Sequence, residues 1–383
     1  MPQLDGLRAL AVGGVLISHF GMGHQLEWLT KALPWGHLGV RLFFVLSGFL
    51  ITRILLERRD AIDEGVQTAS NALLHFYGRR FLRIFPVFYL TIVIAYSFDL
   101  GHIREVAIWH ALYLSNLETV IFNGFLSDQQ SLRDPTSAHF WSLAVEEQFY
   151  LIWPALILFT RKEMLIKVVL AMIVIAPFWR ACWFLYDPTD SSHSLLACLD
   201  SLGAGGLLAI YMKRDSWGLD FLYNRQRLLL ICGSAILFMA CFAHIMKKLS
   251  RPEFVLLDVG ESIVFAFIVA RATQSRGDNL AKFLEWNVLQ YLGKISYGIY
   301  VFHAFMSPVK SWIWRTYSLP DITQSALNPL ILTLMTIVTA TISWYLVEKP
   351  INRLKRNIPR GPVTSTTPVF DFGQKRAASK VVL

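Results

Sequence analysis

The sequence predicts an all-α, polytopic membrane protein, a bundle of about ten transmembrane helices. Of its 383 residues, 54% are hydrophobic and only 16% are charged, which is far from the balance of a soluble domain. Apolar runs near 20 residues long recur along the chain, and an α-helix needs roughly that length to cross a ~30 Å hydrocarbon core. This recurrence favours spanning helices over a barrel.

Each predicted span is one such apolar run. The ten runs cover residues 7–22, 37–56, 81–98, 139–159, 164–186, 193–212, 227–246, 254–272, 288–308 and 326–347. An eleventh candidate, 106–122, contains His110, Asn116 and Glu118. Loops rich in Lys and Arg face the cytoplasm, and the main basic loops share one side only if 106–122 does not cross. We therefore expect 106–122 to be re-entrant or interfacial, with both termini in the cytoplasm.

The chain divides at the last apolar run. Residues 1–350 form the predicted transmembrane domain, and residues 351–383 form a basic cytoplasmic tail that we expect to be disordered. The first run lacks the basic start and the cleavage site of a signal peptide. The four cysteines lie in apolar runs without the spacing of a zinc site, so we expect no bound metal. The lipid bilayer is the expected environment, and nucleic acid is not an expected partner.

Two ionisable groups lie in the first run, where such groups are costly unless they pair or act. Arg8 and His19 are separated by eleven positions. At ~100° and 1.5 Å per residue they return to nearly the same helix face, about 16 Å apart along the axis. A histidine that simply bonds a neighbouring helix is the alternative interpretation of His19.

The stretch "RRFLRIFP" places Arg80 and Arg83 one helical turn apart at the predicted cytoplasmic end of the third span. Two guanidinium groups in this arrangement can bind phosphate through paired hydrogen bonds. A basic cluster that only sets the topology is the alternative.

The stretch "HFWSLAVEEQFYLIWP" carries a polar face in an apolar helix. His139, Glu146 and Tyr150 share that face because their spacings are seven and four. The adjacent carboxylates Glu146 and Glu147 are hard to explain by packing. One can pair with an arginine while the other takes part in the reaction, and the sequence does not decide which.

Two later runs carry polar groups in similar positions. In "KISYGIYVFH", Ser296, Tyr300 and His303 lie at the same kind of spacing. For the tyrosines, an aromatic belt at the membrane surface is the favoured interpretation. Asp258 and Glu261 lie one turn apart near the outer start of the eighth span, a pattern more typical of a buried partner for arginine than of a catalyst.

The predicted orientation sorts these groups by sign. The outer half holds His19, His139, Glu146, Asp258, Glu261 and His303, and the inner half holds Arg8, Arg80 and Arg83. This arrangement favours an anionic ligand on the cytoplasmic side and acid–base chemistry further out.

The chain resembles the membrane acyltransferase-3 family over nearly its whole length. The resemblance rests on "LDGLRALAV…SHF", "GVRLFFVLSGFLIT", "RRFLRIFPVFYL", "FWSLAVEEQFYLIWP", "SYGIYVFH" and "YLVEKP", six segments in the family's order. One departure is Arg41, where many members carry an acidic residue. The chain also lacks the SGNH-type esterase domain that some members carry after the last span, so the resemblance predicts a stand-alone member.

The resemblance implies the transfer of an acyl group, usually acetyl, from acyl-CoA to a carbohydrate hydroxyl. Arg8, Arg80 and Arg83 would then hold the phosphates of the coenzyme, and His19 would act as the general base or carry the acyl group covalently. Glu146 or Glu147 would orient the imidazole or an arginine. His139, Tyr150, Tyr300 and His303 are the candidate substrate-binding residues.

The predicted function is O-acylation, with acetyl-CoA as the expected donor, of a cell-envelope or exported glycan at the bacterial inner membrane. Glycan-assembly proteins are candidate partners. A secondary transporter is the alternative from another class, although no inverted repeat is apparent. A conduit that passes acyl groups to a partner enzyme is the third alternative.

Overall fold

The computed structural model describes most of the chain. The described residues are 1–21, 33–118, 135–186, 193–213, 231, 233–236, 238, 253–275, 277–320 and 327–358.

The described residues contain helices and no strands, which confirms the all-α prediction. The longer helices are α1 (Pro2–Phe20), α3 (Trp35–Asp63), α4 (Ala69–Phe98), α7 (Phe140–Phe159), α8 (Lys162–Tyr186), α9 (Leu195–Lys213), α11 (Glu253–Gln274) and α16 (Leu327–Ser343). The shorter ones are α5 (Ile103–Ala111), α12 (Asn279–Leu284), α13 (Asn287–Lys294), α14 (Ser296–Phe302), α15 (Met306–Thr316) and α17 (Lys349–Leu354). Short 3₁₀ segments are η2 (Leu100–His102), η4 (Pro135–Ser137), η5 (His303–Phe305) and η7 (Lys355–Asn357), and η6 (Trp344–Glu348) is a π-helical turn.

Six helical segments of the described chain are long and apolar enough to cross a membrane. They are Trp35–Asp63, Ala69–Phe98, Phe140–Phe159, Lys162–Leu185, Leu195–Lys213 and Leu327–Leu354. Helices α1 and α11 cover two more of the predicted spans. The predicted span 227–246 lies largely outside the described residues. The protein is therefore multi-pass, and ten crossings remain a prediction.

The prediction of one continuous span over 288–308 is wrong. The chain there forms α13, α14, η5 and α15, and the three α-helices have 8, 7 and 11 residues. The first break falls at Ile295, whose φ and ψ of −95° and 5° leave the helical region. Ser296 Oγ donates to the carbonyl oxygen of Gly293 at 2.9 Å, and such local bonds compete with a continuous helix.

Two boundaries bear on the other predictions. Helix α5 has only nine residues, fewer than the roughly 17 that a span needs, so the described part of 106–122 forms no spanning helix. The predicted tail begins in helix, because α17 runs to Leu354 and η7 to Asn357. Residues 359–383 lie outside the description.

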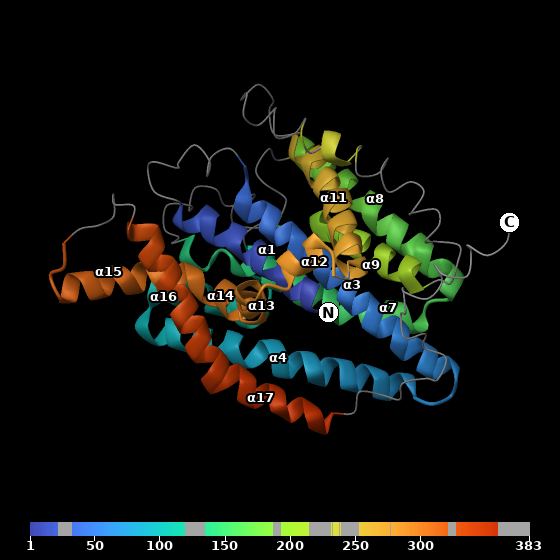
Figure 1. Cartoon of the computed structure of the whole chain (residues 1–383), viewed down its shortest axis with the longest axis horizontal. Helices are drawn as coiled ribbons and strands as arrows, with labels where there is room; N and C mark the ends of the chain where they lie inside the picture. The colour runs from blue at the N-terminus through green and yellow to red at the C-terminus, as the bar shows by residue number, and fades with distance from the viewer. Residues whose placement is uncertain are drawn as a thin grey trace.

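Helices α1 and α3 form the centre of the bundle (Figure 1). Helix α1 packs between α3 and α13, while α3 also contacts α7, α9 and α11. A Cβ atom on Gly48 would collide with the backbone of Leu202, and one on Gly205 would collide with the backbone of Val45. Small residues at these positions let the backbones of α3 and α9 approach closely, as in many membrane helix pairs.

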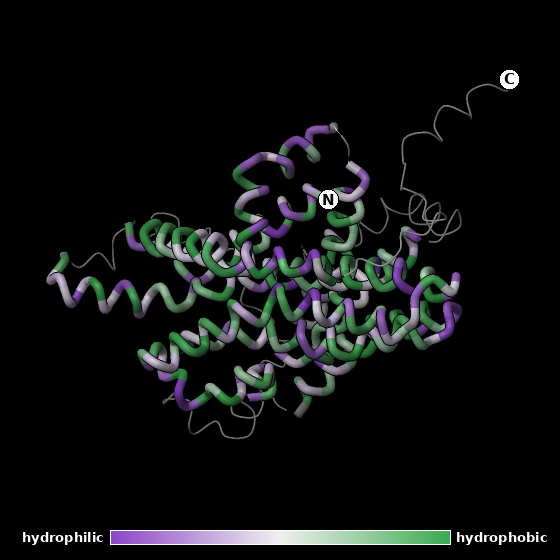
Figure 2. Tube along the Cα trace, turned by 90° about the horizontal axis from the view of Figure 1, so that it is seen from below, coloured by the Kyte–Doolittle hydropathy of each residue, from purple (hydrophilic) through white to green (hydrophobic). Residues whose placement is uncertain are grey.

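Hydrophobic residues dominate the helices, and hydrophilic residues recur inside the bundle (Figure 2). The outer helices also expose large apolar side chains, including Val93 on α4, Val174 on α8 and Leu334 on α16. Exposed apolar faces suit contact with lipid. The polar groups inside the bundle are the ones that need a separate explanation.

Candidate functional site

Helix α1 carries the two ionisable groups predicted from the first run. It is continuous from Pro2 to Phe20, so Arg8 and His19 lie on one helix as expected. The Arg8 guanidinium contacts the Asp5 carboxylate at 2.5 Å. His19 is exposed in the last turn of the described helix, where a ligand can reach its ring.

Helix α4 begins earlier than predicted. The sequence placed the start of this span at residue 81, but the helix begins at Ala69 after Thr68, whose side chain accepts the amide of Asn71. Arg80 and Arg83 therefore lie well inside a 30-residue helix, about 16 Å and about 21 Å from its start, and not at its end. The apolar period alone could not show this, because the first turns of α4 are amphipathic and lie before the apolar run.

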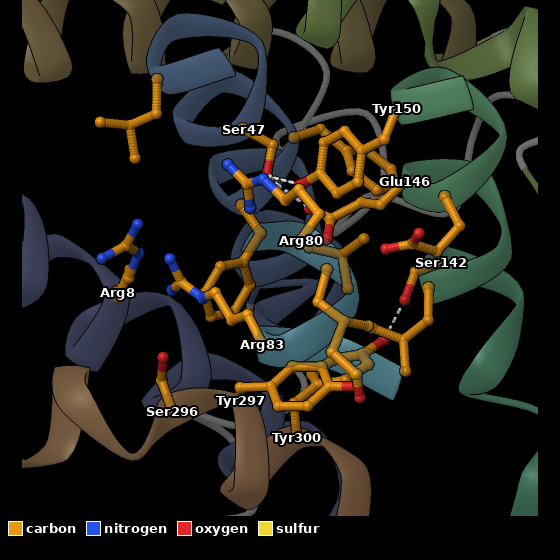
Figure 3. Close-up of a pocket in the computed structure, with 17 residues that line it drawn as sticks. Arg8, Ser47, Arg80, Arg83, Ser142, Glu146, Tyr150, Ser296, Tyr297 and Tyr300 are labelled. Carbon is orange, nitrogen blue, oxygen red and sulfur yellow. Dashed lines mark hydrogen bonds between the residues drawn. The ribbon is translucent and has the colours of Figure 1, made fainter. Parts of the chain in front are cut away.

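Arg8, Arg80 and Arg83 line one cavity between α1, α3, α4, α7 and α14, which we call the arginine pocket (Figure 3). The other polar lining residues are Ser47, Ser142, Glu146, Glu147, Tyr150, Ser296, Tyr297 and Tyr300. The three guanidinium groups point into the same space (Figure 3). The structure thus brings the three predicted phosphate-binding residues together.

Glu146 lies in the arginine pocket beside Arg80. Ser47 Oγ donates to Glu146 Oε1 at 2.6 Å, and Tyr150 Oη donates to Ser47 Oγ at 2.9 Å. The Arg80 guanidinium lies over the Tyr150 ring, 4.9 Å from its centroid, in a cation–π arrangement. The prediction that separated Glu146 from the arginines is therefore wrong, because Arg80 lies deeper in α4 than expected.

Three histidines from three elements form a second group, the histidine cluster of His19, His139 and His303. The ring centroids of His19 and His303 are 4.6 Å apart, and those of His139 and His303 are also 4.6 Å apart. His139 and His303 are buried. The Nδ1 atom of His303 faces the Tyr300 carbonyl oxygen at 2.6 Å, which assigns the proton to Nδ1. Its Nε2 is then a free acceptor, without a hydrogen-bond partner among the described residues.

Tyr300 joins the arginine pocket to the histidine cluster. Its side chain lines the pocket and its hydroxyl contacts Ser142 Oγ. The same hydroxyl donates to the His139 carbonyl at 3.1 Å, and the Tyr300 ring lies 5.5 Å from that of His303. Tyr300 is therefore a buried residue at the boundary of both groups. The interpretation of Tyr300 as part of an aromatic belt is therefore wrong.

A third charged group, the buried ion network, lies elsewhere in the bundle and contains Arg41, Arg180, Asp200, Asp258, Glu261 and His37. Arg41 contacts Asp200 at 3.1 Å and forms a shorter contact with Asp258. Arg180 contacts the same two carboxylates at 2.7 and 3.3 Å. Asp258 is thus a buried partner for arginine, as its position in the sequence suggested.

His37 completes this network at its more exposed edge. Its Nε2 lies 2.6 Å from Asp258 Oδ1 and 3.4 Å from Glu261 Oε2. His37, Asp258 and Glu261 offer ligand atoms within 4.8 Å of one another, the only such group found among the described residues. Because Asp258 already shares the Arg41 and Arg180 guanidinium groups with Asp200, we assign these residues to charge pairing. The expected absence of a metal remains a prediction.

Sequence reasoning missed three polar residues of the arginine pocket. Ser47 bonds Glu146, Ser142 contacts Tyr300, and Tyr297 donates to the Ile84 carbonyl at 2.8 Å. All three lie inside segments that carried the family resemblance. Their hydroxyl groups gave no signal by themselves, because serine and tyrosine are common in membrane helices.

These features describe a multi-pass membrane protein whose charged cavity adjoins a cluster of imidazoles. Residues 1–348 match the model of the acyltransferase domain family, and the chain belongs to that family. Membership agrees with the resemblance predicted from the six sequence segments. No solved structure matches the chain.

Several bacterial relatives share most of this chain. The peptidoglycan O-acetyltransferase OatA of Listeria monocytogenes is 30% identical over 373 residues, covering 92% of this chain and 56% of that protein. The O-acetyltransferase OatA of Staphylococcus aureus is 28% identical, covering 92% and 57%. The putative peptidoglycan O-acetyltransferase YrhL of Bacillus subtilis is 28% identical, covering 92% and 55%. The chain therefore spans little more than half the length of these relatives.

Proposed function

We propose that this protein transfers an acyl group, acetyl in the first place, from acyl-CoA to hydroxyl groups of a cell-envelope glycan. One observation carries the proposal: in a member of the acyltransferase family, the arginine pocket adjoins the histidine cluster through Tyr300. The relatives named as peptidoglycan O-acetyltransferases support an envelope glycan, and peptidoglycan is the first acceptor to test. Family membership does not favour a transporter.

The donor side of the reaction belongs to the arginine pocket. Arg80 and Arg83 bind the phosphates of the coenzyme, with Arg8 on the opposite wall, because guanidinium groups pair with phosphate oxygens through two parallel hydrogen bonds. The pantetheine arm then extends along α1 toward His19, about 16 Å from Arg8. Ser47 holds Glu146 in the same pocket as Arg80 (Figure 3), and we assign Glu146 the role of keeping Arg80 in position.

The acceptor side belongs to the histidine cluster. His19 removes the proton of the acceptor hydroxyl while the hydroxyl oxygen attacks the thioester carbonyl carbon. The C–S bond breaks, the coenzyme leaves as a thiolate that takes the proton from His19, and an ester remains on the acceptor. His139 and His303 line the place where the acceptor binds. In the variant with a covalent intermediate, His19 itself attacks and carries the acyl group.

The test is acetyl transfer by the purified protein in lipid nanodiscs, supplied with labelled acetyl-CoA and glycan fragments and without any ion gradient. Label in the glycan, lost in His19→Ala but kept in His75→Gln, supports the proposal. His75 is a suitable control because it lies near the start of α4 and contacts Gln67 at 3.3 Å, away from the pocket lining. Mass spectrometry of envelope glycans from a deletion strain identifies the acceptor by its lost acetyl mass. No label transfer and no lost mass would reject the proposal.

The protein's place in the cell follows from the same proposal. We infer an inner-membrane location with both termini in the cytoplasm, where acyl-CoA is made, so that the acyl group crosses the bilayer inside the protein. Glycan-assembly proteins are the partners that would present the acceptor.

A further inference from the structure

The end of the described chain packs beside the arginine-bearing helix. Arg79 Nη1 donates to the carbonyl oxygens of Lys355 at 3.1 Å and Ile358 at 2.9 Å. A Cβ atom on Gly78 would lie 3.2 Å from Ile358 Cδ1, so the two segments approach closely. Figure 1 shows α17 running along α4. This packing holds Lys355, which follows the last candidate span, next to the basic side of α4.

Lys355 therefore lies in a field of positive charge. Burial and then, in that order, the charges of Arg83, Arg80 and Arg79 together lower the pKa of its ammonium group to about 7, while Glu348 partly offsets them. Neither Lys355 nor Arg83 forms an ion pair within 4.0 Å among the residues that the structure describes. Glu348 is an acidic neighbour of this cluster, but the positive charges outnumber it, and an excess of positive charge favours binding of an anion.

The basic groups lie in two places, so that each could bind a different phosphate of the coenzyme. Arg8, Arg80 and Arg83 face the interior of the pocket (Figure 3), whereas Lys355 lies outside the pocket lining, on the 3₁₀ turn that Arg79 holds. Acyl-CoA likewise carries a diphosphate next to the pantetheine arm and a separate phosphate on the 3′ position of its ribose. An ammonium group binds phosphate as a point charge and needs no fixed planar geometry.

We propose that Lys355 binds the ribose 3′-phosphate of the acyl-CoA donor and so sets the preference for the intact coenzyme over donors that lack this phosphate. The proposal rests on the proposed function, because it assigns one further contact to the same donor. The negative charge of the bound phosphate offsets the repulsion from Arg79, Arg80 and Arg83 and so keeps Lys355 protonated.

The test compares acetyl-CoA with acetyl-3′-dephospho-CoA as donors for the wild-type protein, Lys355→Gln and Arg356→Gln. Arg356 is the matched control, since it is the next residue on the same turn and is exposed. We expect the wild type to prefer acetyl-CoA about tenfold or more in kcat/KM, as loss of a charged hydrogen bond of ~1.5–3 kcal/mol implies. Lys355→Gln should lose most of this preference through a higher KM for acetyl-CoA alone, and Arg356→Gln should keep it.

The pH dependence gives a second readout. As the pH rises from 7 to 8.5, unbound Lys355 loses its proton, while the phosphate is already largely ionised. The preference should therefore shrink in the wild type, stay flat in Lys355→Gln, and persist at high pH in Lys355→Arg, whose guanidinium remains charged.

The outcomes separate this proposal from the proposed function. A wild-type protein that uses neither donor would reject the acyl-CoA reaction itself. A protein that uses acetyl-CoA, but whose preference survives in Lys355→Gln, would reject the role of Lys355 only. Equal weakening of both donors in Lys355→Gln would also reject it, because a purely structural residue would act in that way.

Discussion

The arginine pocket and the buried ion network both contain arginines and carboxylates, but the two groups differ in how their arginines are paired. In the network, Arg41 and Arg180 share two carboxylates, and those four side chains are at most 3% exposed. In the pocket, Arg80 lies over an aromatic ring and Arg83 has no ion pair among the described residues. The network pairs its arginines with carboxylates, whereas in the described residues Arg80 and Arg83 face a cavity without an ion pair.

The difference in pairing distinguishes charges that stabilise the helix bundle from charges that are available to bind a ligand. Buried ions cost several kcal/mol each unless they are paired. In the network, the protein supplies the partners itself and excludes a ligand. In the pocket, the remaining cost is offset when an anion enters, so binding and charge compensation are the same event.

The largest effect is expected from breaking the network. Arg41→Met leaves two buried carboxylates short of a partner, and removal of one partner of a buried pair costs about 3–5 kcal/mol. The variant should lose its folded peak in size-exclusion chromatography or unfold at a much lower temperature. Adding Asp258→Asn should recover much of the loss. Full thermal stability of Arg41→Met would contradict the structural role of the network.

The next largest effect is expected on catalytic activity, with no change in thermal stability. His19→Ala should reduce acetyl transfer by about 10²–10⁴-fold, the usual contribution of a general base, while the unfolding temperature stays near that of the wild type. If the variant kept more than a tenth of the activity, His19 would be a structural residue.

A smaller effect distinguishes the two adjacent carboxylates. Glu146 accepts a hydrogen bond from Ser47 at 2.6 Å, and the structure describes no such bond for Glu147. Glu146→Gln loses a charged acceptor worth ~1.5–3 kcal/mol, so activity should fall about 10- to 100-fold, and Glu147→Gln should fall less. The reverse order in kcat/KM would assign the main role to Glu147.

The smallest effect is expected from breaking an exposed ion pair, for comparison with the buried ion network. Lys162 contacts Asp63 at 2.6 Å, but the two side chains are 56% and 44% exposed. Exposed pairs contribute less than about 1 kcal/mol. Lys162→Ala should leave both activity and unfolding temperature nearly unchanged. A loss comparable to that of Arg41→Met would mean that exposure does not explain the difference between the charged groups.

The sequence singled out several residues that line the arginine pocket, but it did not predict how they are arranged there. Apolar periodicity predicted most helices, and the spacing of Arg8 and His19 predicted their common helix. Apolar periodicity could not predict that α4 begins at Ala69, because the first turns of α4 are not uniformly apolar. The earlier start places Arg80 inside the helix, in the same pocket as Glu146.

The breaks in the helical segment that begins at Asn287 could not be predicted from the sequence pattern either. Its apolar composition suits a span, but a serine–carbonyl bond at Gly293 interrupts the helix. The partners of Arg41 were unpredictable for a different reason. Asp200 and Asp258 are distant in sequence, and only tertiary packing brings them together.

The central claim is that Arg80 and Arg83, which form no ion pair among the described residues, bind a coenzyme anion. The most direct measurement is calorimetric titration of the nanodisc-embedded protein with CoA at fixed salt, for the wild type, Arg80→Lys with Arg83→Lys, and Arg53→Gln. Arg53 is a fair control because it already pairs with Glu57 at 3.2 Å outside the pocket lining. The account predicts binding to the wild type and Arg53→Gln, and affinity at least about tenfold weaker in the double variant, which keeps the charge but loses the planar groups. Equal affinity in all three proteins, or no binding to the wild type, would contradict it.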